Sequence, residues 1–374
     1  MRVSWIVPGF QSDETDRCIP ALTDLAHQVA TKHRLKVYAL QYPHRRDSYR
    51  IGQVEIESFG TGQRGKVARL ERICLLTVAL KAIQSQPGEL LHAFWAAEPA
   101  LLGAVAAKLT GRKLIVSFMG GEAVYLPEIA YGVAHRLLDR FYVQAALKGA
   151  THLTCGSNTL AELLVARYGE RVKPLVLPLG VDLVRFRAPD PRTKPLPDKP
   201  LLLAVGSLLS VKGYANLIKA VAQVPEVKLR IVGEGPERPG LKQLIRSMHL
   251  EERVSLAGQV APEEISGEYA RADLLVLSSY YESQCVALVE GMACGLPVVA
   301  APVGLAPALL QSNRAGELAS GNAPIELSRA ITRLLARRTE WAELRKAARE
   351  AAATLSLENC SGNFLQLYRA VSSE

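Results

Sequence analysis

The sequence contains little of what marks several common classes of protein. Aromatic residues make up only 6% of the 374 residues, and no helix-turn-helix, zinc-finger or RNA-recognition pattern is present, so we expect no nucleic acid partner. No apolar run reaches the roughly 20 residues that a membrane-spanning helix needs. Pro8 interrupts the apolar start too soon for a secretory signal, and Met1–Gly9 is expected to begin with a buried strand.

The spacing of the cysteines matches no metal-binding or disulfide pattern. The six cysteines are scattered, with no CxxC pair and no histidine nearby, which argues against a zinc site and against a disulfide framework. This usage favours the reducing cytoplasm, with the inner face of the membrane as the alternative location. No spacing of Ser, His and Asp, or of Cys and His, assembles a nucleophilic catalytic group, and His92 is expected in the core or at its rim.

The length and the charge of the chain suggest two unlike halves. A chain of 374 residues is comfortable for two domains. The net charge is +9, and Met1–Arg187 holds 24 Lys and Arg against 16 Asp and Glu, whereas the rest holds 21 against 20. A basic half suits an anionic ligand or peripheral contact with an anionic membrane. The basic run from Arg45 to Arg72 is equally what a solvated face looks like.

Strand and helix patterns alternate through both halves. In the first half the predicted strands are Arg2–Val7, Lys36–Gln41, Val54–Ser58, Glu89–Phe94, Lys113–Phe118, His152–Cys155 and Pro174–Pro178. The predicted helices are Asp16–Thr31, Lys66–Ser85, Pro99–Leu109, Gly132–Leu147 and Thr159–Tyr168. In the second half the predicted strands are Leu201–Val205, Lys228–Val232, Val254–Ala257, Leu274–Leu277 and Val298–Ala301, with helices between them. Such short, nearly continuous apolar strands are typical of buried parallel sheets.

This alternation predicts an α/β protein with two doubly wound, Rossmann-like domains. Residues 188–200 contain five prolines and are predicted to be the linker. The N-terminal domain is expected to span residues 1–187 and the C-terminal domain residues 201–357. A last helix over residues 358–374 is expected to cross back to the first domain.

Three loops in the second half follow predicted strands and carry unusual residues. Gly206 opens a turn that leads to Lys212-Gly213, and Val232-Gly233-Glu234-Gly235-Pro236 makes a second turn. Glu282 and Glu290 bracket seven residues after a third strand, where a buried carboxylate needs a partner. Because ligands bind at the carboxyl ends of strands in open α/β sheets, the three loops are expected at one edge.

Together these motifs resemble the family 4, or group 1, glycosyltransferases of the GT-B fold. The family pattern G-x5-K-G, V-G-x-G-P, E-x7-E and G-x-P-V-V-A is matched from Gly206 to Ala300. Val254–Val260, Tyr269–Asp273, Ser279, Cys155–Asn158 and Leu179–Asp182 also fit. The resemblance implies transfer of a sugar from a nucleotide-diphosphate sugar to an acceptor sugar or lipid-linked acceptor, with retention, in cell-surface polysaccharide or glycolipid synthesis.

The resemblance also implies residue roles. Lys212 would neutralise the donor diphosphate, Glu282 would hold sugar hydroxyls, and Glu290 would accept hydrogen bonds from the ribose. The further donor-binding positions are Gly206, Ser207, Gly233, Glu234, Val260, Gln284, Cys285, Val286 and Ala287. Gly9, Phe10, Met119, Gly120 and Gly121 would line the acceptor side of an interdomain cleft, with Glu122 as a third catalytic residue. No metal and no cofactor is expected, since the nucleotide-sugar is a co-substrate.

Three positions depart from the family pattern. Ser207 stands where Arg is frequent, Met119-Gly120-Gly121-Glu122 replaces His-Gly-x-Asp, and Ala308 stands where Glu is frequent. A methionine cannot donate the hydrogen bond of a histidine, whereas Glu122 keeps a carboxylate.

Each of these residues also has a purely structural alternative. Glu282 could only face the start of a helix, Glu290 could pair with a cation of the protein, and Met119 could only pack in the core. The alternative functions are a nucleotide-sugar epimerase of the same fold and a catalytically silent nucleotide-sugar-binding or scaffold protein.

Overall fold

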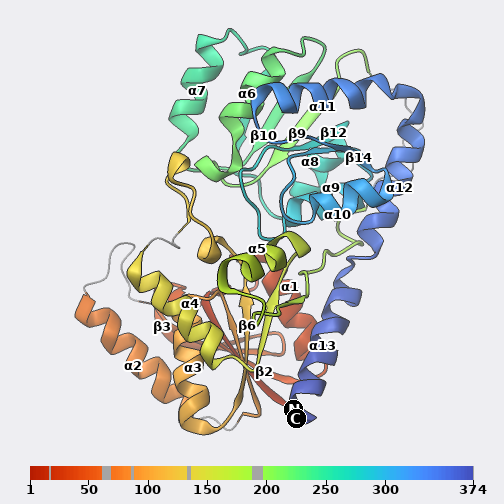
Figure 1. Cartoon of the computed structure of the whole chain (residues 1–374). Helices are drawn as coiled ribbons and strands as arrows, with labels where there is room; N and C mark the ends of the chain where they lie inside the picture. The colour runs from red at the N-terminus through yellow and green to blue at the C-terminus, as the bar shows by residue number, and fades with distance from the viewer. Residues whose placement is uncertain (17, 61–68, 86–87, 133–135, 188–196, 374) are drawn as a thin grey trace. The chain divides into compact units, whose positions relative to one another are not determined.

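The protein divides into two compact units. The computed structural model describes residues 1–374 except 17, 61–68, 86–87, 133–135, 188–196 and 374 (Figure 1). Unit 1 comprises Met1–Leu126, Gly132–Gly180 and Leu357–Glu374, and unit 2 comprises Pro127–Tyr131 and Val181–Ser356. Most of the predicted linker and part of the basic run from Arg45 to Arg72 lie outside the described residues.

Unit 1 is built on an eight-stranded sheet of order β3-β4-β2-β1-β5-β6-β7-β8. Its strands are β1 (Arg2–Gly9), β2 (Arg34–Tyr42), β3 (Arg46–Ile51), β4 (Val54–Phe59), β5 (Leu90–Phe94), β6 (Lys113–Phe118), β7 (His152–Cys155) and β8 (Leu175–Val176). All neighbouring strands are parallel except β3 and β4. Every residue of β5 is buried, as expected of a central strand covered on both faces.

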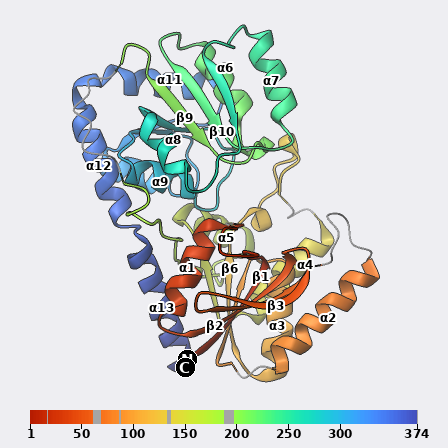
Figure 2. The same ribbon diagram turned by 180° about the vertical axis from the view of Figure 1, so that it is seen from behind.

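Helices cover both faces of this sheet. They are α1 (Pro20–Ala30), α2 (Arg69–Ser85), α3 (Glu98–Thr110), α4 (Leu137–Gly149), α5 (Asn158–Tyr168) and α13 (Leu357–Ser373), with the short η1 (Gly121–Ala123) after β6. Figures 1 and 2 show α2, α3 and α4 together on one face and α1 beside α13 on the other. The last helix therefore completes unit 1, where Tyr368 accepts a hydrogen bond from Trp5 Nε1 at 3.0 Å.

Unit 2 is built on a six-stranded, wholly parallel sheet of order β11-β10-β9-β12-β13-β14. Its strands are β9 (Leu201–Val205), β10 (Lys228–Val232), β11 (Val254–Gly258), β12 (Leu274–Leu277), β13 (Val298–Ala300) and β14 (Gly316–Leu318). Side chains of β9 alternate between two cores: Leu202 and Ala204 join one, and Leu203 joins the other. Both faces are thus apolar, which explains the uninterrupted apolar strands of the sequence.

The helices of unit 2 divide between these two cores. They are α6 (Tyr214–Ala222), α7 (Arg238–Ser247), α8 (Ile265–Arg271), α9 (Val286–Ala293), α10 (Ala306–Asn313), α11 (Pro324–Ala336) and α12 (Trp341–Ala353), with short turns η2 (Pro127–Ile129), η3 (Ser210–Lys212) and η4 (Arg338–Glu340). Helices α6, α7 and α11 contribute to the first core, and α8, α9 and α10 to the second. Helix α12 contributes to both, with Trp341 in the first and Ala348 in the second. No helix in the described part of either unit is both long and apolar enough to cross a bilayer.

The strand order of each sheet reverses at one point. In unit 1 the chain moves outward from β1 in one direction and then resumes on the other side with β5; in unit 2 the same reversal lies between β9 and β12. At such a point, consecutive connections leave toward opposite faces and open a crevice at the carboxyl ends of the strands. The loops after β9 and β12 are therefore expected to form the walls of a binding site.

The prediction of two doubly wound α/β units is confirmed, and several element predictions need correction. Helix α1 begins at Pro20 rather than Asp16, because proline fits the first turn of a helix. Strand β3 was not predicted; its residues Arg46–Arg50 are mostly charged and exposed, as is typical of an edge strand. The short β14 was also missed.

Candidate active site

Lys212 and Glu282 meet at the strand-order reversal of unit 2. Lys212 ends η3, in the loop after β9, and Glu282 lies in the loop after β12. The Lys212 ammonium donates to Glu282 Oε1 at 2.7 Å, and the side chains are 24% and 12% exposed. Burial opposes the charged form of Lys212, but the charge and hydrogen bond of Glu282, together with other neighbouring groups, raise the pKa of the ammonium. The sequence prediction that these loops converge is confirmed.

Two glycines shape the loop that carries Lys212. Gly213 has φ +65°, and a Cβ there would lie 2.2 Å from the carbonyl oxygen of Ser278. The Ser278 hydroxyl in turn donates to the Lys212 carbonyl at 2.8 Å. Gly206 lies against the same lysine, since a Cβ there would be 3.3 Å from Lys212 Cε. The loop after β9 is thus tied to the end of β12, which fixes the lysine within the crevice.

Glu282 is held from a second side by the strand end. The Ser279 hydroxyl donates to Glu282 Oε1 at 2.7 Å, so the same oxygen receives both Lys212 and Ser279. Glu282 therefore has two side-chain partners and does not only face the start of a helix. The backbone turns sharply between Glu282 and α9, where Cys285 adopts φ 76°.

The first turn of α9 offers backbone N–H groups near this ion pair. Cys285 precedes the helix, and Val286 and Ala287 are its first residues, all predicted donor-binding positions. Burial, followed by the Glu282 charge, raises the pKa of the Cys285 thiol, which therefore stays protonated. Gln284 is buried, and its carbonyl accepts from Leu305 N at 3.0 Å. A helix start beside a lysine suits an anionic oxygen.

Glu290 lies in the middle of α9 and accepts a hydrogen bond from a tyrosine. The Tyr269 hydroxyl, fully buried on α8, donates to Glu290 Oε2 at 2.7 Å. Burial and the Glu290 carboxylate both raise the pKa of Tyr269, which keeps its proton and remains a donor. This contact orients the half-buried carboxylate, a residue with two acceptor oxygens.

The loop after β10 packs directly on the loop after β9. Gly206 N donates to the Val232 carbonyl at 3.0 Å, and Leu208 N donates to the Glu234 carbonyl at 2.8 Å. Gly233, with φ +142°, leaves room for the Gly206 carbonyl, which a Cβ would approach to 2.0 Å. The second predicted loop is therefore joined to the first by backbone hydrogen bonds.

Side chains around this junction are less enclosed. Glu234 is exposed and pairs with Arg238 at 2.8 Å. Val260 is half-buried against the second core, and Ser207 is exposed. Ala308 is exposed on α10.

In unit 1 the predicted acceptor residues also follow strand ends. Met119–Glu122 come directly after β6, and the buried Glu122 carboxylate accepts from the backbone N–H groups of Ala96, Met119 and Gly120 at 3.1, 3.2 and 2.7 Å. Burial raises the pKa of Glu122 despite these donors. In the structure this carboxylate holds together the loops after β5 and β6.

The remaining unit 1 positions surround that arrangement. A Cβ on Gly120 would lie 3.2 Å from Trp95 Nε1, and Met119 is half-buried, whereas Gly121 begins η1. Gly9 ends β1, and the buried Phe10 donates its N–H to the Tyr42 carbonyl at 3.0 Å.

The chain is similar to known families, proteins and solved structures. A model described as glycosyl transferases group 1 matches residues 187–354, and one described as glycosyl transferase 4-like domain matches residues 21–180. The D-inositol 3-phosphate glycosyltransferase of Nocardiopsis dassonvillei is 31% identical over 317 residues, which cover 77% of this chain and 72% of that protein. The chain belongs to the group 1 glycosyltransferases.

A further relative and two solved structures are also similar to this chain. The D-inositol 3-phosphate glycosyltransferase of Mycobacterium marinum is 32% identical over 203 residues, which cover 51% of this chain and 43% of that protein. Sucrose-phosphate synthase from Thermosynechococcus elongatus superposes with TM-score 0.83 at 24% identity, covering 100% and 99% of the two chains. Anabaena HepE, solved with UDP and glucose, gives TM-score 0.77 at 20% identity, covering 99% and 100%. The predicted GT-B fold is confirmed.

His92 lies in the core of unit 1. His92 is fully buried, with Nδ1 2.6 Å from Tyr368 Oη and Nε2 2.7 Å from Ser117 Oγ. Burial lowers its pKa to about 3. The expectation of a core histidine is confirmed.

Two contacts near this crevice were not predicted from the sequence. Tyr269 fitted a family motif but had no predicted contact, although a buried tyrosine hydroxyl usually requires a partner. The segment Pro127–Tyr131 was placed with the first half, yet it joins unit 2: the Ser210 hydroxyl donates to the Ile129 carbonyl at 3.0 Å. Tyr131 also lies beside Tyr281, with ring centroids 6.1 Å apart. No local sequence pattern signals such a long-range return.

Proposed function

We propose that this chain transfers a glycosyl group from a nucleoside-diphosphate sugar, held in the crevice of unit 2, to a sugar or lipid-linked acceptor. The observation that carries the proposal is the Lys212–Glu282 pair at the strand-order reversal, beside the start of α9. The lysine has three N–H donors, so it keeps Glu282 while it donates to a phosphate oxygen. Glycan synthesis is the setting that the related enzymes suggest.

Residue roles in the proposal follow from position. Lys212 and the first N–H groups of α9 neutralise the diphosphate, because both place positive charge at one spot. Glu290, oriented by Tyr269, accepts hydrogen bonds from the ribose hydroxyls. Glu282 accepts a hydrogen bond from Ser279. In the proposal, it also accepts a hydrogen bond from a hydroxyl group of the donor sugar.

We further propose that transfer retains the anomeric configuration. The bond from the anomeric carbon to the diphosphate oxygen breaks, and a bond from the same carbon to the acceptor oxygen forms on the same face. The acceptor's proton passes to the departing phosphate oxygen, which Lys212 and α9 stabilise. Metal independence belongs to the same proposal, since these groups supply the positive charge that a divalent cation would otherwise supply.

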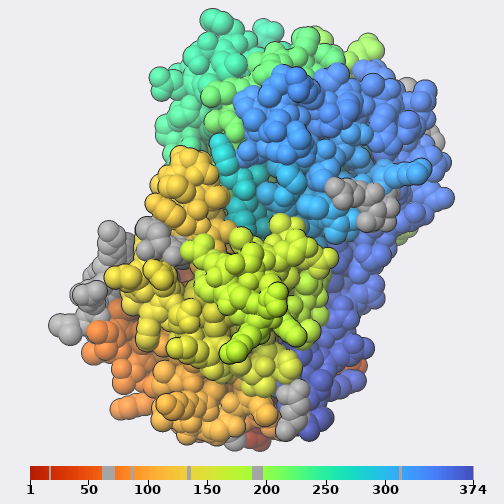
Figure 3. Space-filling view, viewed as in Figure 1, coloured from red at the N-terminus to blue at the C-terminus, as the bar shows by residue number. Residues whose placement is uncertain are grey.

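We also propose that unit 1 binds peripherally to an anionic membrane, where a lipid-linked acceptor would lie. Helix α4, on the face of unit 1 shown in Figure 3, exposes Leu137, Leu138 and Phe141 at 81%, 55% and 57%. Arg136 and Arg140 are exposed beside them. Exposed apolar side chains next to cations suit peripheral binding to anionic lipid. Replacing Leu137 and Phe141 by Ser should abolish co-sedimentation with phosphatidylglycerol vesicles; sedimentation equal to that of the wild type would contradict this part.

The donor site is tested by binding of UDP, GDP and ADP and of their sugar conjugates, measured by calorimetry without added metal. One nucleotide should bind, and Glu290→Ala should weaken it at least tenfold. Because that change also leaves the Tyr269 hydroxyl without this partner, Tyr269→Phe is the matched control. Tyr269→Phe should retain most of the affinity.

Three results would overturn or redirect the proposal. Unchanged affinity in Glu290→Ala would remove the ribose role, and no binding of any nucleotide would remove the donor site. Nucleotide binding without turnover across acceptors would indicate a silent binding protein. The comparisons do not favour that alternative or an epimerase.

A further inference from the structure

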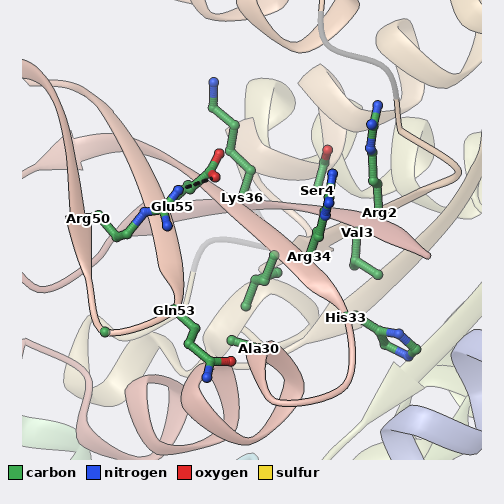
Figure 4. A pocket seen from close by; sticks show the side chains of 12 residues that line it. Arg2, Val3, Ser4, Ala30, His33, Arg34, Lys36, Arg50, Gln53 and Glu55 are labelled. Carbon is green, nitrogen blue, oxygen red and sulfur yellow. Dashed lines mark hydrogen bonds and ion pairs between the residues drawn. The ribbon is translucent and has the colours of Figure 1, made fainter.

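A hollow lies at the amino-terminal edge of the unit 1 sheet. It has a volume of about 650 Å³, and its lining includes Arg2, Ser4, His33, Arg34, Lys36 and Arg50 (Figure 4). Arg2 and Arg34 are the first residues of β1 and β2. Gly9, a predicted acceptor-side residue, ends β1 at the opposite edge of the same sheet. The hollow is therefore a different place from the crevice where the donor is proposed to bind.

The strand register gathers cations on one side of this hollow. Arg2 is paired with Arg34, and Ser4 with Lys36, across the parallel strands β1 and β2. Since paired residues point to the same face of a sheet, these side chains lie together. Figure 4 shows Arg2, Arg34 and Lys36 extending to the same side.

Only part of this charge is neutralised within the protein. Lys36 pairs with Glu57 at 2.7 Å, and Arg50 pairs with Glu55 at 2.7 Å. Among the residues that the structure describes, no carboxylate forms an ion pair with Arg2 or Arg34. Like charges on neighbouring strands disfavour folding, so two adjacent arginines without an acidic partner indicate a role beyond stability.

We propose that this hollow is a second anion site, which binds a phosphate group between Arg2 and Arg34. Guanidinium groups present paired N–H donors that match phosphate oxygens. Lys36, already shared with Glu57, adds longer-range attraction. The phosphate belongs either to a soluble phosphorylated compound or to a lipid headgroup, and both present the same oxygens. This inference goes beyond the proposed transferase function and does not depend on it.

The test is the thermal shift produced by inorganic phosphate against sodium chloride of equal ionic strength. It compares wild type, Arg2→Gln/Arg34→Gln and the matched control Arg171→Gln/Arg246→Gln, which removes equal charge from exposed positions elsewhere. Phosphate affinity should fall about tenfold or more in the first pair, since each charge-assisted contact is substantial, and should stay unchanged in the control. Lys212→Ala should also keep the effect, which separates this site from the donor crevice.

A second arm identifies the source of the phosphate. The same variants are co-sedimented with phosphatidylcholine vesicles with and without phosphatidic acid. Loss of sedimentation in Arg2→Gln/Arg34→Gln alone assigns the site to a headgroup, whereas phosphate binding without vesicle dependence on this pair assigns it to a soluble compound. Equal effects of both charge-removing pairs in both arms, or loss of the phosphate effect in Lys212→Ala, would overturn the proposal.

Discussion

The carboxyl edges of the two sheets use carboxylates in opposite ways. In unit 2, Glu282 is 12% exposed and pairs with a lysine side chain. In unit 1, Glu122 is buried and its oxygens accept backbone N–H groups from three residues. A carboxylate paired with a lysine side chain is able to exchange that partner for a ligand group, whereas one bound by three backbone N–H groups joins the loops that carry them. The two sheets thus hold a carboxylate at the same kind of edge in two different environments.

The largest expected effect comes from breaking the unit 2 pair. Lys212→Ala removes the cation beside the proposed diphosphate, and transfer should fall about 100- to 1000-fold, as when one transition-state donor is deleted. Initial rates with saturating donor and acceptor measure it. Lys219→Ala, an exposed lysine on α6, is the control.

The corresponding change in unit 1 should act on stability. Glu122→Gln puts an amide among three backbone donors and should lower the free energy of unfolding by about 1–3 kcal/mol. Urea denaturation of both variants sharpens the comparison. If Lys212→Ala were as active as Lys219→Ala, the contrast between the edges would be lost.

A second comparison uses two glycines with nearly equal backbone angles. Gly111 in unit 1 has φ +69° with nothing within 4 Å of a Cβ, whereas at Gly213 in unit 2, with φ +65°, a Cβ would meet the Ser278 carbonyl at 2.2 Å. Gly111→Ala should cost about 1 kcal/mol from backbone strain alone. Gly213→Ala should cost about 3 kcal/mol or more, because overpacking adds to the strain. Equal unfolding midpoints for the two variants would refute this reading of the loop.

Buried histidine gives the units different acid sensitivity. The pKa of His92 is lowered by burial from 6.5 to about 3, so the unfolded chain takes up a proton first as the pH falls. Stability from neutral His92 is present above pH 6.5 and is lost below it, by about 2 kcal/mol at pH 5. The only histidine of unit 2 is His249, so hydrogen exchange should show unit 1 losing more protection. Equal losses in both units between pH 7 and 5 would contradict the expectation.

What the sequence predicted well was local. Gly206, Lys212, Glu282 and Glu290 stand in short motifs at strand ends, and parallel strands bring their carboxyl ends to one edge. The ion pair between Lys212 and Glu282 was not predicted, although the rule places their two loops at the same edge. Apolar strands were predictable for the same reason, since both faces of each sheet are covered.

What the sequence did not predict depends on contacts between distant segments. Tyr269 reaches Glu290 from another helix, and Pro127–Tyr131 returns to unit 2 from the first half. The role of Glu122 was predicted from a motif position, yet its surroundings are backbone groups that no motif encodes. The edge strand β3 was hidden because exposed edges favour charge over alternation. In each case tertiary neighbours, rather than local preference, decide.

The smallest expected effect tests whether a positive charge at position 207, in the loop after β9, would strengthen binding of the diphosphate. Ser207 is exposed beside Gly206, so Ser207→Arg should leave stability unchanged. If the loop contacts a diphosphate, the added guanidinium should tighten nucleoside-diphosphate binding about three- to tenfold, which is about 1 kcal/mol. Leu209→Arg, two residues along the same loop and 41% exposed, adds the same net charge at another angle. A gain at Ser207 alone would mean that a phosphate oxygen lies within reach of that position, while an equal gain in both variants would reflect only general attraction. No gain in either would show that Lys212 and the start of α9 already satisfy the diphosphate, and that serine at this position has no cost for the site.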